Sequence, residues 1–166
     1  MNKMSDIERK LRNWIPSPYQ NAARNLAKDA IKKFVKQADN QVIGLGSGPM
    51  AAEIVREMKN GVKNKKTIEY VVTSFQIKLE AQYSGLKVVD ESRIPEIDIV
   101  FDGANEIDSK YNMIKGSGGA LLKEKIVHSA AKKVVITAES KKFVENFTWA
   151  VPIEVSPFAI HGNKRT

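Results

Sequence analysis

The chain contains no cysteine and only two histidines, His128 and His161. The lack of cysteine excludes disulfides, thiolate catalysis and cysteine-ligated metal sites, and it is compatible with a cytoplasmic protein. Two histidines are too few for a histidine-rich metal centre. A magnesium site built from carboxylates alone stays open but has no signature in the sequence. His128 lies in an apolar helical pattern, which favours a structural or surface role for this residue.

Long apolar runs are also absent. No stretch approaches the roughly 20 apolar residues of a membrane span, and no signal peptide follows the charged N-terminus. With 42% hydrophobic and 28% charged residues, the composition is that of a soluble globular protein. The length suits one main domain. We therefore expect a cytoplasmic protein that has no membrane partner.

Acidic residues are the minority among the charged ones. The chain has 27 lysines and arginines against 19 aspartates and glutamates, which gives a net charge of +8. A solvated basic surface is the simplest explanation, and attraction of a phosphorylated metabolite is the next. The lysines are scattered along the expected helices, and no nucleic-acid module motif is present. A nucleic-acid partner is therefore not expected.

Apolar periodicity predicts helices that alternate with strands. The expected helices cover residues 17–34, 49–58, 74–83 and 120–131. The expected strands cover residues 42–45, 68–72, 87–89, 97–101 and 134–136, with a further candidate at 151–155. The first helix is expected to begin at a Ser17 cap followed by Pro18. Repeated strand–helix units indicate the α/β class, with a Rossmann-like open, mostly parallel sheet and helices on both faces.

Ligands of such sheets bind at the carboxyl ends of the strands, and the polar motifs of this chain fall there. Residues 44–49, Gly-Leu-Gly-Ser-Gly-Pro, can offer backbone N–H groups to a phosphate, although a simple tight turn explains them as well. The next strand ends in Thr73 and Ser74, which a helix cap alone would explain. A dinucleotide site would need an acidic residue there, and a P-loop would need Gly-Lys-Ser/Thr, so neither is expected.

Charged residues follow the fourth expected strand. Asp102 stands at the strand end before a glycine, which lets a ligand approach closely, whereas Glu106 and Asp108 are also explained by a solvated loop. Residues 115–125 place a lysine before a glycine-rich turn and Glu124 in the first turns of a helix, where the helix dipole favours an acid. Taken alone, Lys115 is better explained as a surface charge. Taken together, these residues suit the binding of a small polyol and the transfer of a proton on it.

Two segments resemble the signatures of ribose-5-phosphate isomerase type A. Residues 102–106, Asp-Gly-Ala-Asn-Glu, resemble that family's Asp-Gly-Ala-Asp-Glu, with Asn105 in place of an aspartate. Residues 115–125 resemble its Lys-Gly-Gly-Gly-Ala-Ala-Leu-Thr-Arg-Glu-Lys. The loop at 46–50 resembles its Gly-Thr-Gly-Ser-Thr phosphate loop, with Ser47 for the threonine and Pro49-Met50 for the Ser-Thr pair. The resemblance runs from about residue 22 to about residue 157.

This resemblance implies an aldose–ketose isomerase of the non-oxidative pentose phosphate pathway. It would interconvert D-ribose 5-phosphate and D-ribulose 5-phosphate through an enediolate, with no cofactor and no metal. Glu124 would be the base, Lys115 would stabilise the enediolate, and Asp102 would bind sugar hydroxyls. Asn105 takes the place of an aspartate that assists proton handling, and asparagine cannot accept a proton at neutral pH.

The resemblance also implies a set of substrate-binding residues: Gly46, Ser47, Gly48, Thr73, Ser74, Gly103, Ala104, Gly116, Ser117, Gly118 and Lys141. For Ser140 and Lys141, a helix cap with an exposed lysine is an equally good explanation. Thr73 and Ser74 can cap a helix and face the cleft at the same time.

Family members continue past residue 155 into a small α+β subdomain that helps to build the assembly. We therefore expect an N-terminal arm or helix over 1–16, a Rossmann-like sugar-phosphate-binding domain over 17–148, and the start of a second α+β subdomain, cut short, over 149–166. A homo-oligomer is expected. The alternative function is a non-catalytic sugar-phosphate-binding protein derived from the same family, because Asn105, Pro49, Met50 and the short C-terminus depart from the enzyme pattern.

Overall fold

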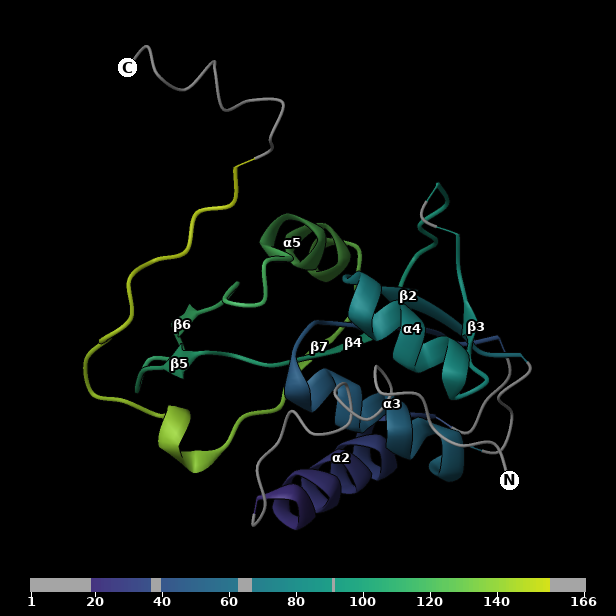
Figure 1. Cartoon of the computed structure of the whole chain (residues 1–166), viewed down its shortest axis with the longest axis horizontal. Helices are drawn as coiled ribbons and strands as arrows, with labels where there is room; N and C mark the ends of the chain where they lie inside the picture. The colour runs from purple at the N-terminus through teal and green to yellow at the C-terminus, as the bar shows by residue number, and fades with distance from the viewer. Residues whose placement is uncertain (1–18, 37–39, 63–66, 91, 156–166) are drawn as a thin grey trace.

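The computed structural model describes residues 19–36, 40–62, 67–90 and 92–155. Five parallel strands form its central sheet, in the order β3-β2-β1-β4-β7 (Figure 1). Their bounds are β1 Val42–Leu45, β2 Glu69–Val72, β3 Lys87–Val88, β4 Ile99–Asp102 and β7 Val134–Ile136. The predicted α/β class and the mostly parallel sheet are confirmed.

Helices cover both faces of this sheet, as predicted (Figure 1). Their bounds are α2 Gln20–Phe34, α3 Pro49–Gly61, α4 Phe75–Tyr83 and α5 Leu121–Ser129, and a short 3₁₀ helix, η1, covers Ser140–Lys142. Helices α2, α3 and α4 share one apolar core with the sheet, and α5 packs against the opposite face.

Side chains of β4 point alternately to the two faces of the sheet. Ile99 and Phe101 belong to the core on the α3 side, whereas Val100 contacts the cluster that contains Val127 of α5. Because successive side chains of a strand point to opposite faces, Asp102 lies on the same face as Val100. The last residue of β4 is therefore an aspartate directed toward α5.

Strands β1 and β4 are neighbours in the middle of the sheet, with Leu45 opposite Phe101. After β1 the chain continues to β2 on one side, whereas after β4 it reaches β7 on the other side. Such a switch point separates the two loops that leave the carboxyl ends of the strands, and ligands of open α/β sheets bind there. Here the two loops contain Gly46–Gly48 and residues 103–105.

A second, two-stranded sheet was not predicted. Strand β5 (Glu106–Ile107) pairs with β6 (Met113–Ile114) in the antiparallel direction, directly after the loop that follows β4. Two-residue strands are too short to show a period in the sequence. This hairpin carries the chain from Asp102 to Lys115, so it sets how the two predicted motifs face each other.

Other sequence predictions need correction or lie outside the described residues. The candidate strand at 151–155 is wrong: these residues have no regular secondary structure, and none of the described strands pairs with them. The expected arm at 1–16 and the Ser17–Pro18 cap fall outside the described residues, within which α2 begins after Tyr19. In the described part of the chain, no helix combines the length and the apolar character needed to cross a membrane.

Candidate active site

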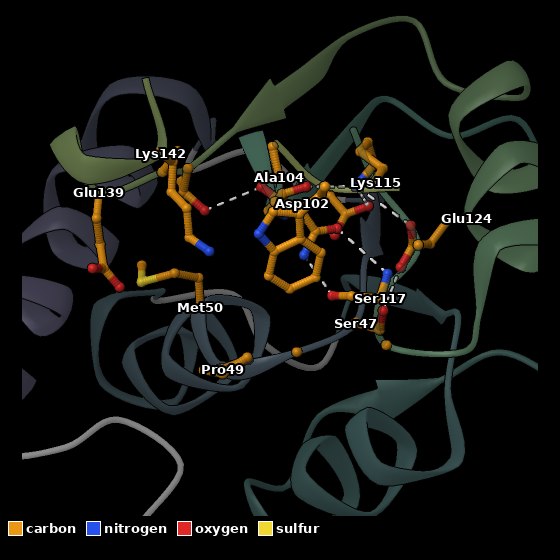
Figure 2. Close-up of a pocket in the computed structure, with 18 of the residues that line it drawn as sticks. Ser47, Pro49, Met50, Asp102, Ala104, Lys115, Ser117, Glu124, Glu139 and Lys142 are labelled. Atoms are coloured by element: carbon orange, nitrogen blue, oxygen red, sulfur yellow. Dashed lines mark hydrogen bonds and ion pairs between the residues drawn. The ribbon is translucent and has the colours of Figure 1, made fainter. Parts of the chain in front are cut away.

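A cavity of about 420 Å³ lies at the carboxyl ends of β1 and β4 (Figure 2). Eleven of the fifteen predicted site residues line it: Ser47, Gly48, Asp102, Gly103, Ala104, Asn105, Lys115, Gly116, Ser117, Gly118 and Glu124. Further lining residues are Pro49, Met50, Gln76, Thr137, Ala138, Glu139, Lys142 and Trp149. Segments that are far apart in the sequence therefore meet around one polar space.

Asp102 is the most buried charged residue of the cavity wall, with 1% of its side chain exposed. Its Oδ2 accepts hydrogen bonds from Lys115 Nζ at 2.7 Å and His128 Nε2 at 2.9 Å, and its Oδ1 accepts one from the backbone N–H of Gly103 at 2.7 Å. Burial alone would raise the pKa of this carboxyl. The hydrogen bond from His128, together with the charge and hydrogen bond of Lys115, outweighs burial and holds the pKa below its ordinary value. Asp102 is therefore an anion at neutral pH.

Lys115 is placed by the turn that follows β6 and contacts three oxygen atoms, two through hydrogen bonds and one through an ion pair. Its ammonium contacts Asp102 Oδ2, the backbone oxygen of Gly103 at 2.5 Å, and Glu124 Oε2 at 3.4 Å. An ammonium has three N–H donors, so the longest of these contacts is the one that a substrate oxygen would replace most readily. Lys115 thus presents a fixed positive charge beside a second carboxylate.

Glu124 lies in the first turn of α5 and is buried. Its Oε1 accepts a hydrogen bond from the hydroxyl of Ser47, in the loop after β1. Its Oε2 is buried, and none of the described residues donates a hydrogen bond to it. Buried polar atoms are usually hydrogen-bonded, so an exception at a cavity wall points to a group that meets a ligand. A carboxylate with one available oxygen beside an ammonium is suited to removing a proton next to a carbonyl.

Glycines bring these segments within reach of one another. A Cβ atom built on Gly46 would lie 1.9 Å from Asp102 Oδ1, and one built on Gly118 would lie 2.8 Å from Ser47 Oγ. Gly48 has φ +92° and Gly116 has φ +97°, which are left-handed conformations that favour glycine. The glycine-rich motifs therefore serve close packing of the two loops as much as ligand approach.

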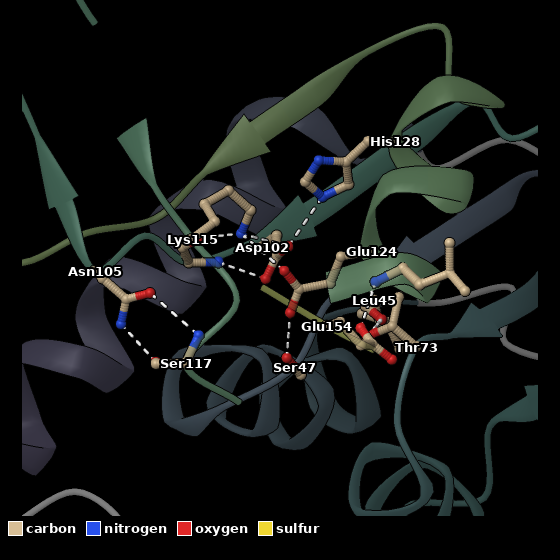
Figure 3. Close-up of polar contacts among 12 residues, drawn as sticks. Leu45, Ser47, Thr73, Asp102, Asn105, Lys115, Ser117, Glu124, His128 and Glu154 are labelled. Atoms are coloured by element: carbon tan, nitrogen blue, oxygen red, sulfur yellow. Dashed lines mark hydrogen bonds and ion pairs between the residues drawn. The ribbon is translucent and has the colours of Figure 1, made fainter. Parts of the chain in front are cut away.

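Asn105 and Ser117 form a reciprocal pair between the two signature segments. Asn105 Nδ2 donates to Ser117 Oγ at 2.5 Å, and the backbone N–H of Ser117 donates to Asn105 Oδ1 at 3.4 Å (Figure 3). The asparagine amide needs both its donor and its acceptor for this arrangement. In this structure Asn105 therefore ties the loop after β4 to the glycine-rich turn.

Four predicted substrate-binding residues do not line the cavity: Gly46, Thr73, Ser74 and Lys141. Thr73 is buried, and its hydroxyl donates to the backbone oxygen of Leu45. Ser74 caps α4 by accepting the backbone N–H of Ile77 at 3.3 Å. Lys141 pairs with Glu139 at 2.6 Å. A role for these four residues in substrate binding stays a prediction.

The structure adds residues that the sequence did not single out. Lys142 rather than Lys141 faces the cavity, on the opposite side from Lys115 and Glu124 (Figure 2). Trp149 also lines the cavity, because buried Glu106 accepts hydrogen bonds from the backbone N–H groups of Thr148 at 2.8 Å and Trp149 at 3.2 Å. No local sequence pattern predicts that Lys142 or Trp149 lines the cavity.

His128, for which the sequence favoured a structural or surface role, contacts Asp102. It follows Glu124 by four positions on α5, and residues with this spacing share a helix face. That spacing is the signal that could have found it. Among the described residues, no group of three histidine or carboxylate side chains is arranged to hold a metal ion.

Comparisons with known proteins place the chain in a family. Residues 69–166 match the family model of ribose 5-phosphate isomerase A (phosphoriboisomerase A). Ribose-5-phosphate isomerase from Dictyostelium discoideum is 43% identical over 144 residues, a match that covers 84% of this chain and 60% of that protein.

Solved structures show the same relationship. The ribose 5-phosphate isomerase of Plasmodium falciparum superposes with a TM-score of 0.69 at 31% identity, over 77% of this chain and 55% of that one. A D-ribose-5-phosphate isomerase in complex with phospho-erythronic acid superposes with a TM-score of 0.67 at 31% identity, over 75% and 55%. The chain thus spans between 55% and 60% of the length of these relatives. Because the family model matches more than half of its residues, the chain belongs to the ribose 5-phosphate isomerase A family.

Proposed function

We propose that this chain is an aldose–ketose isomerase that interconverts D-ribose 5-phosphate and D-ribulose 5-phosphate through an enediolate. The observation that carries the proposal is the contact of Lys115 with both Asp102 and Glu124 at the cavity, with one Glu124 oxygen left without a donor among the described residues. This is a base and an oxyanion partner side by side. A related enzyme that binds phospho-erythronic acid, a phosphorylated sugar acid, supports the substrate class.

The proposed steps use these two side chains. Glu124 Oε2 removes the C2 proton of the open-chain aldose, and the electron pair of that C–H bond forms a C1=C2 double bond. Negative charge moves to O1, where the Lys115 ammonium stabilises it. The O2–H proton then moves to O1, the O2 electrons form the C2 carbonyl, and Glu124 returns its proton to C1. The atoms and electrons balance without a redox partner.

The substrate phosphate would lie at the far side of the cavity from Glu124. Lys142 lines that side, as Figure 2 shows, and among the lining residues it is the cation other than Lys115. Its ammonium lies 5.8 Å from the centroid of the Trp149 ring. A phosphate there would leave C1 and C2 near Glu124. The net charge of +8 adds attraction for such an anion.

Asn105 favours a second candidate, a non-catalytic sugar-phosphate-binding protein. An asparagine cannot accept a proton at neutral pH, and here both ends of its amide are bonded to Ser117. If the reaction needs a proton acceptor at this position, the cavity would bind substrate without turnover. The mechanism above needs no such acceptor, which is why we favour the isomerase.

Ribose 5-phosphate incubated with the protein in deuterium oxide tests both candidates. The isomerase is expected to form the ketose and to introduce deuterium at the exchanging carbon, both visible by NMR. Glu124→Gln should abolish both signals, whereas Glu145→Gln, the same change at an exposed position, should leave them unchanged. If the unmodified protein shows no exchange and ribose 5-phosphate still raises its melting temperature, the binding protein is the correct assignment.

The cytoplasmic location, the homo-oligomer and the domain division at residues 16 and 148 stay predictions. Analytical ultracentrifugation of the full chain tests the oligomer, for which the expected result is a mass at least twice the 18.5 kDa of one chain. A monomer over a wide concentration range would contradict that prediction.

A further inference from the structure

His128 contacts the site from a side that the proposed mechanism does not use. It lies one turn after Glu124 on α5, and its Nε2 is 2.9 Å from Asp102 Oδ2 (Figure 3). The side chain of His128 is 20% exposed, whereas that of Asp102 is 1% exposed. The imidazole therefore reaches from the partly open face of α5 to a carboxylate inside the site.

The direction of this hydrogen bond follows from the charge of Asp102. An ionised carboxylate can only accept, so the proton between the two groups belongs to His128 Nε2. The same Oδ2 atom accepts Lys115 Nζ at 2.7 Å, and the two donors approach it from different elements. Asp102 is thus hydrogen-bonded both to α5 and to the turn that carries Lys115.

A second cavity, of about 370 Å³, lies on the His128 side of this cluster. Its lining comprises Lys115, Leu121, Glu124, Lys125, His128 and Ser129. Lys115 and Glu124 line both cavities, so the reacting pair separates the substrate cavity from the one that holds His128. Asp102 from β4 contacts His128, and the charged groups that line this cavity with it are Lys115 from the turn after β6 and Glu124 and Lys125 from its own helix.

We propose that His128 is a positioning residue of the isomerase site, whose Nε2–H fixes the Asp102 carboxylate against Lys115 so that the ammonium stays beside Glu124. The inference rests on the proposed isomerase function. His128 does not contact the substrate cavity and is not the base; it acts through Asp102. This gives a role in the site to His128, the one histidine among the described residues.

The expected pH effect has a definite sign. The hydrogen bond from His128 is one of the causes that lower the pKa of Asp102. Without that donor, the pKa rises and Asp102 takes up a proton at a higher pH. A neutral Asp102 no longer balances the Lys115 charge, so activity should fail at a higher pH than in the unmodified protein. The acidic limb of the kcat/KM profile therefore moves upward.

Two amides provide a matched test. Glutamine can place an N–H donor close to the position of the imidazole Nε2, whereas asparagine is one methylene shorter and cannot reach Asp102. We expect His128→Asn to lower kcat/KM about tenfold near pH 5 and less at higher pH, which is about what a hydrogen bond to a charged group contributes. His128→Gln should return the profile close to that of the unmodified protein. A His128→Gln profile displaced as far as that of His128→Asn would overturn the proposal.

A measurement without substrate separates this inference from the proposed function. In protein labelled with ¹³C at aspartate carboxyls, the Asp102 resonance should titrate at a higher pH in His128→Asn than in either His128→Gln or the unmodified protein. If that shift occurs but the protein shows no isomerase activity, the proposed function is wrong, whereas the effect of His128 on Asp102 is supported. Equal Asp102 titration in all three proteins would show a merely structural histidine.

Discussion

Asn105 and Ser117 bond to each other at the edge of the cavity, and each stands where the family signature has a different residue. The family pattern has aspartate at the first position and glycine at the second. Glycine offers no hydroxyl, so Ser117 supplies an acceptor that the Asn105 amide can use. The two departures are thus matched to each other, which explains how an asparagine is accommodated beside a glycine-rich turn.

A double-mutant cycle tests this match. Asn105→Ala and Ser117→Ala should each reduce the free energy of unfolding, and together they should cost less than the sum, with a coupling of about 0.5–1 kcal/mol. Urea unfolding of the four proteins measures it. A cycle of Asn105→Ala with Ser129→Ala, whose hydroxyl bonds Lys125 within α5, should be additive. A coupling of zero for Asn105 and Ser117 would mean that their contact does not hold the turn.

The position of Gly46, in the loop after β1, has no room for a side chain. In Gly46→Ala the new Cβ would lie 1.9 Å from Asp102 Oδ1, so either Asp102 or the loop after β1 must shift. We expect kcat to fall about 100-fold, because a displacement of about 1 Å in a catalytic group is enough for such a loss. Steady-state kinetics measures this.

Gly61→Ala is the matched control for that substitution. The nearest atom to its new Cβ is Ile31 Cγ2, at an ordinary 3.7 Å, and Gly61 lies at the end of a helix where alanine is favourable. Its activity should be unchanged. If Gly46→Ala keeps the same kcat as this control, the close contact with Asp102 does not matter for catalysis.

Single residues were predictable from sequence where a strand or helix boundary fixed them. Asp102 ends an apolar strand and Glu124 lies in the first turn of a helix, so both fall at the end of the sheet where the cavity lies. Trp149 was not predictable, because a distant carboxylate, Glu106, holds it at the cavity. Lys142 faces the cavity instead of Lys141 because of the phase of a single 3₁₀ turn, which no period in the sequence reveals.

At the scale of elements, the beginning of α5 depends on a segment far along the chain. Ala120 at its N-cap position offers no side-chain acceptor. The Glu154 carboxylate accepts the backbone N–H of Leu122 at 2.6 Å instead. An anion at this end also interacts favourably with the helix dipole. The irregular segment 151–155 thus serves as the cap of the helix that carries both Glu124 and His128.

Glu154→Ala should therefore destabilise α5 by about 1 kcal/mol, the usual cost of losing an N-terminal cap. Thermal melting of the variant measures the loss, and amide hydrogen exchange should show faster exchange in the first turn of α5. Glu145→Ala removes a carboxylate from an exposed position and should change neither. Unchanged exchange at Leu122 in Glu154→Ala would contradict the capping role.

Most elements could be predicted because apolar periodicity matches their burial. The expected strands at 42–45 and 134–136 coincide with β1 and β7. Residues 151–155 have the alternating composition of a strand, but a strand also needs a partner, and pairing is decided by the tertiary structure. The helix expected over 49–58 continues to Gly61, because the Asn60–Gly61 stop signal falls inside its last turn.

Over the whole molecule, three carboxylates tie separate parts of the chain together. Asp98 accepts the backbone N–H of Val42 at 2.9 Å and so links β4 to β1. Asp102 links β4 to α5 and to Lys115. Glu106 links β5 to Thr148 and Trp149. Each of these links is stronger when its carboxylate is ionised, so together they make the assembled site sensitive to acid.

The pKa values of all three groups are lowered, which fixes the sign of the pH dependence. The Val42 N–H lowers the pKa of Asp98. For Asp102 and Glu106, burial acts to raise the pKa, but hydrogen bonds from His128 and Lys115, or from Thr148 and Trp149, outweigh it. A carboxyl whose folded pKa lies below the unfolded value stabilises the fold above the unfolded pKa, near 4. That contribution is lost as the pH falls through the folded pKa.

We therefore expect the melting temperature to stay nearly constant from about pH 7 to about pH 5 and to fall steeply below about pH 4, where the unfolded carboxyls take up protons. Scanning calorimetry across this range measures it. Asp98→Asn keeps an acceptor for Val42 but does not titrate, so its curve should begin lower and fall less in acid. The two curves should converge at the lowest pH, because protonated Asp98 and asparagine are then both neutral. Parallel curves would show that Asp98 takes no part in the acid response.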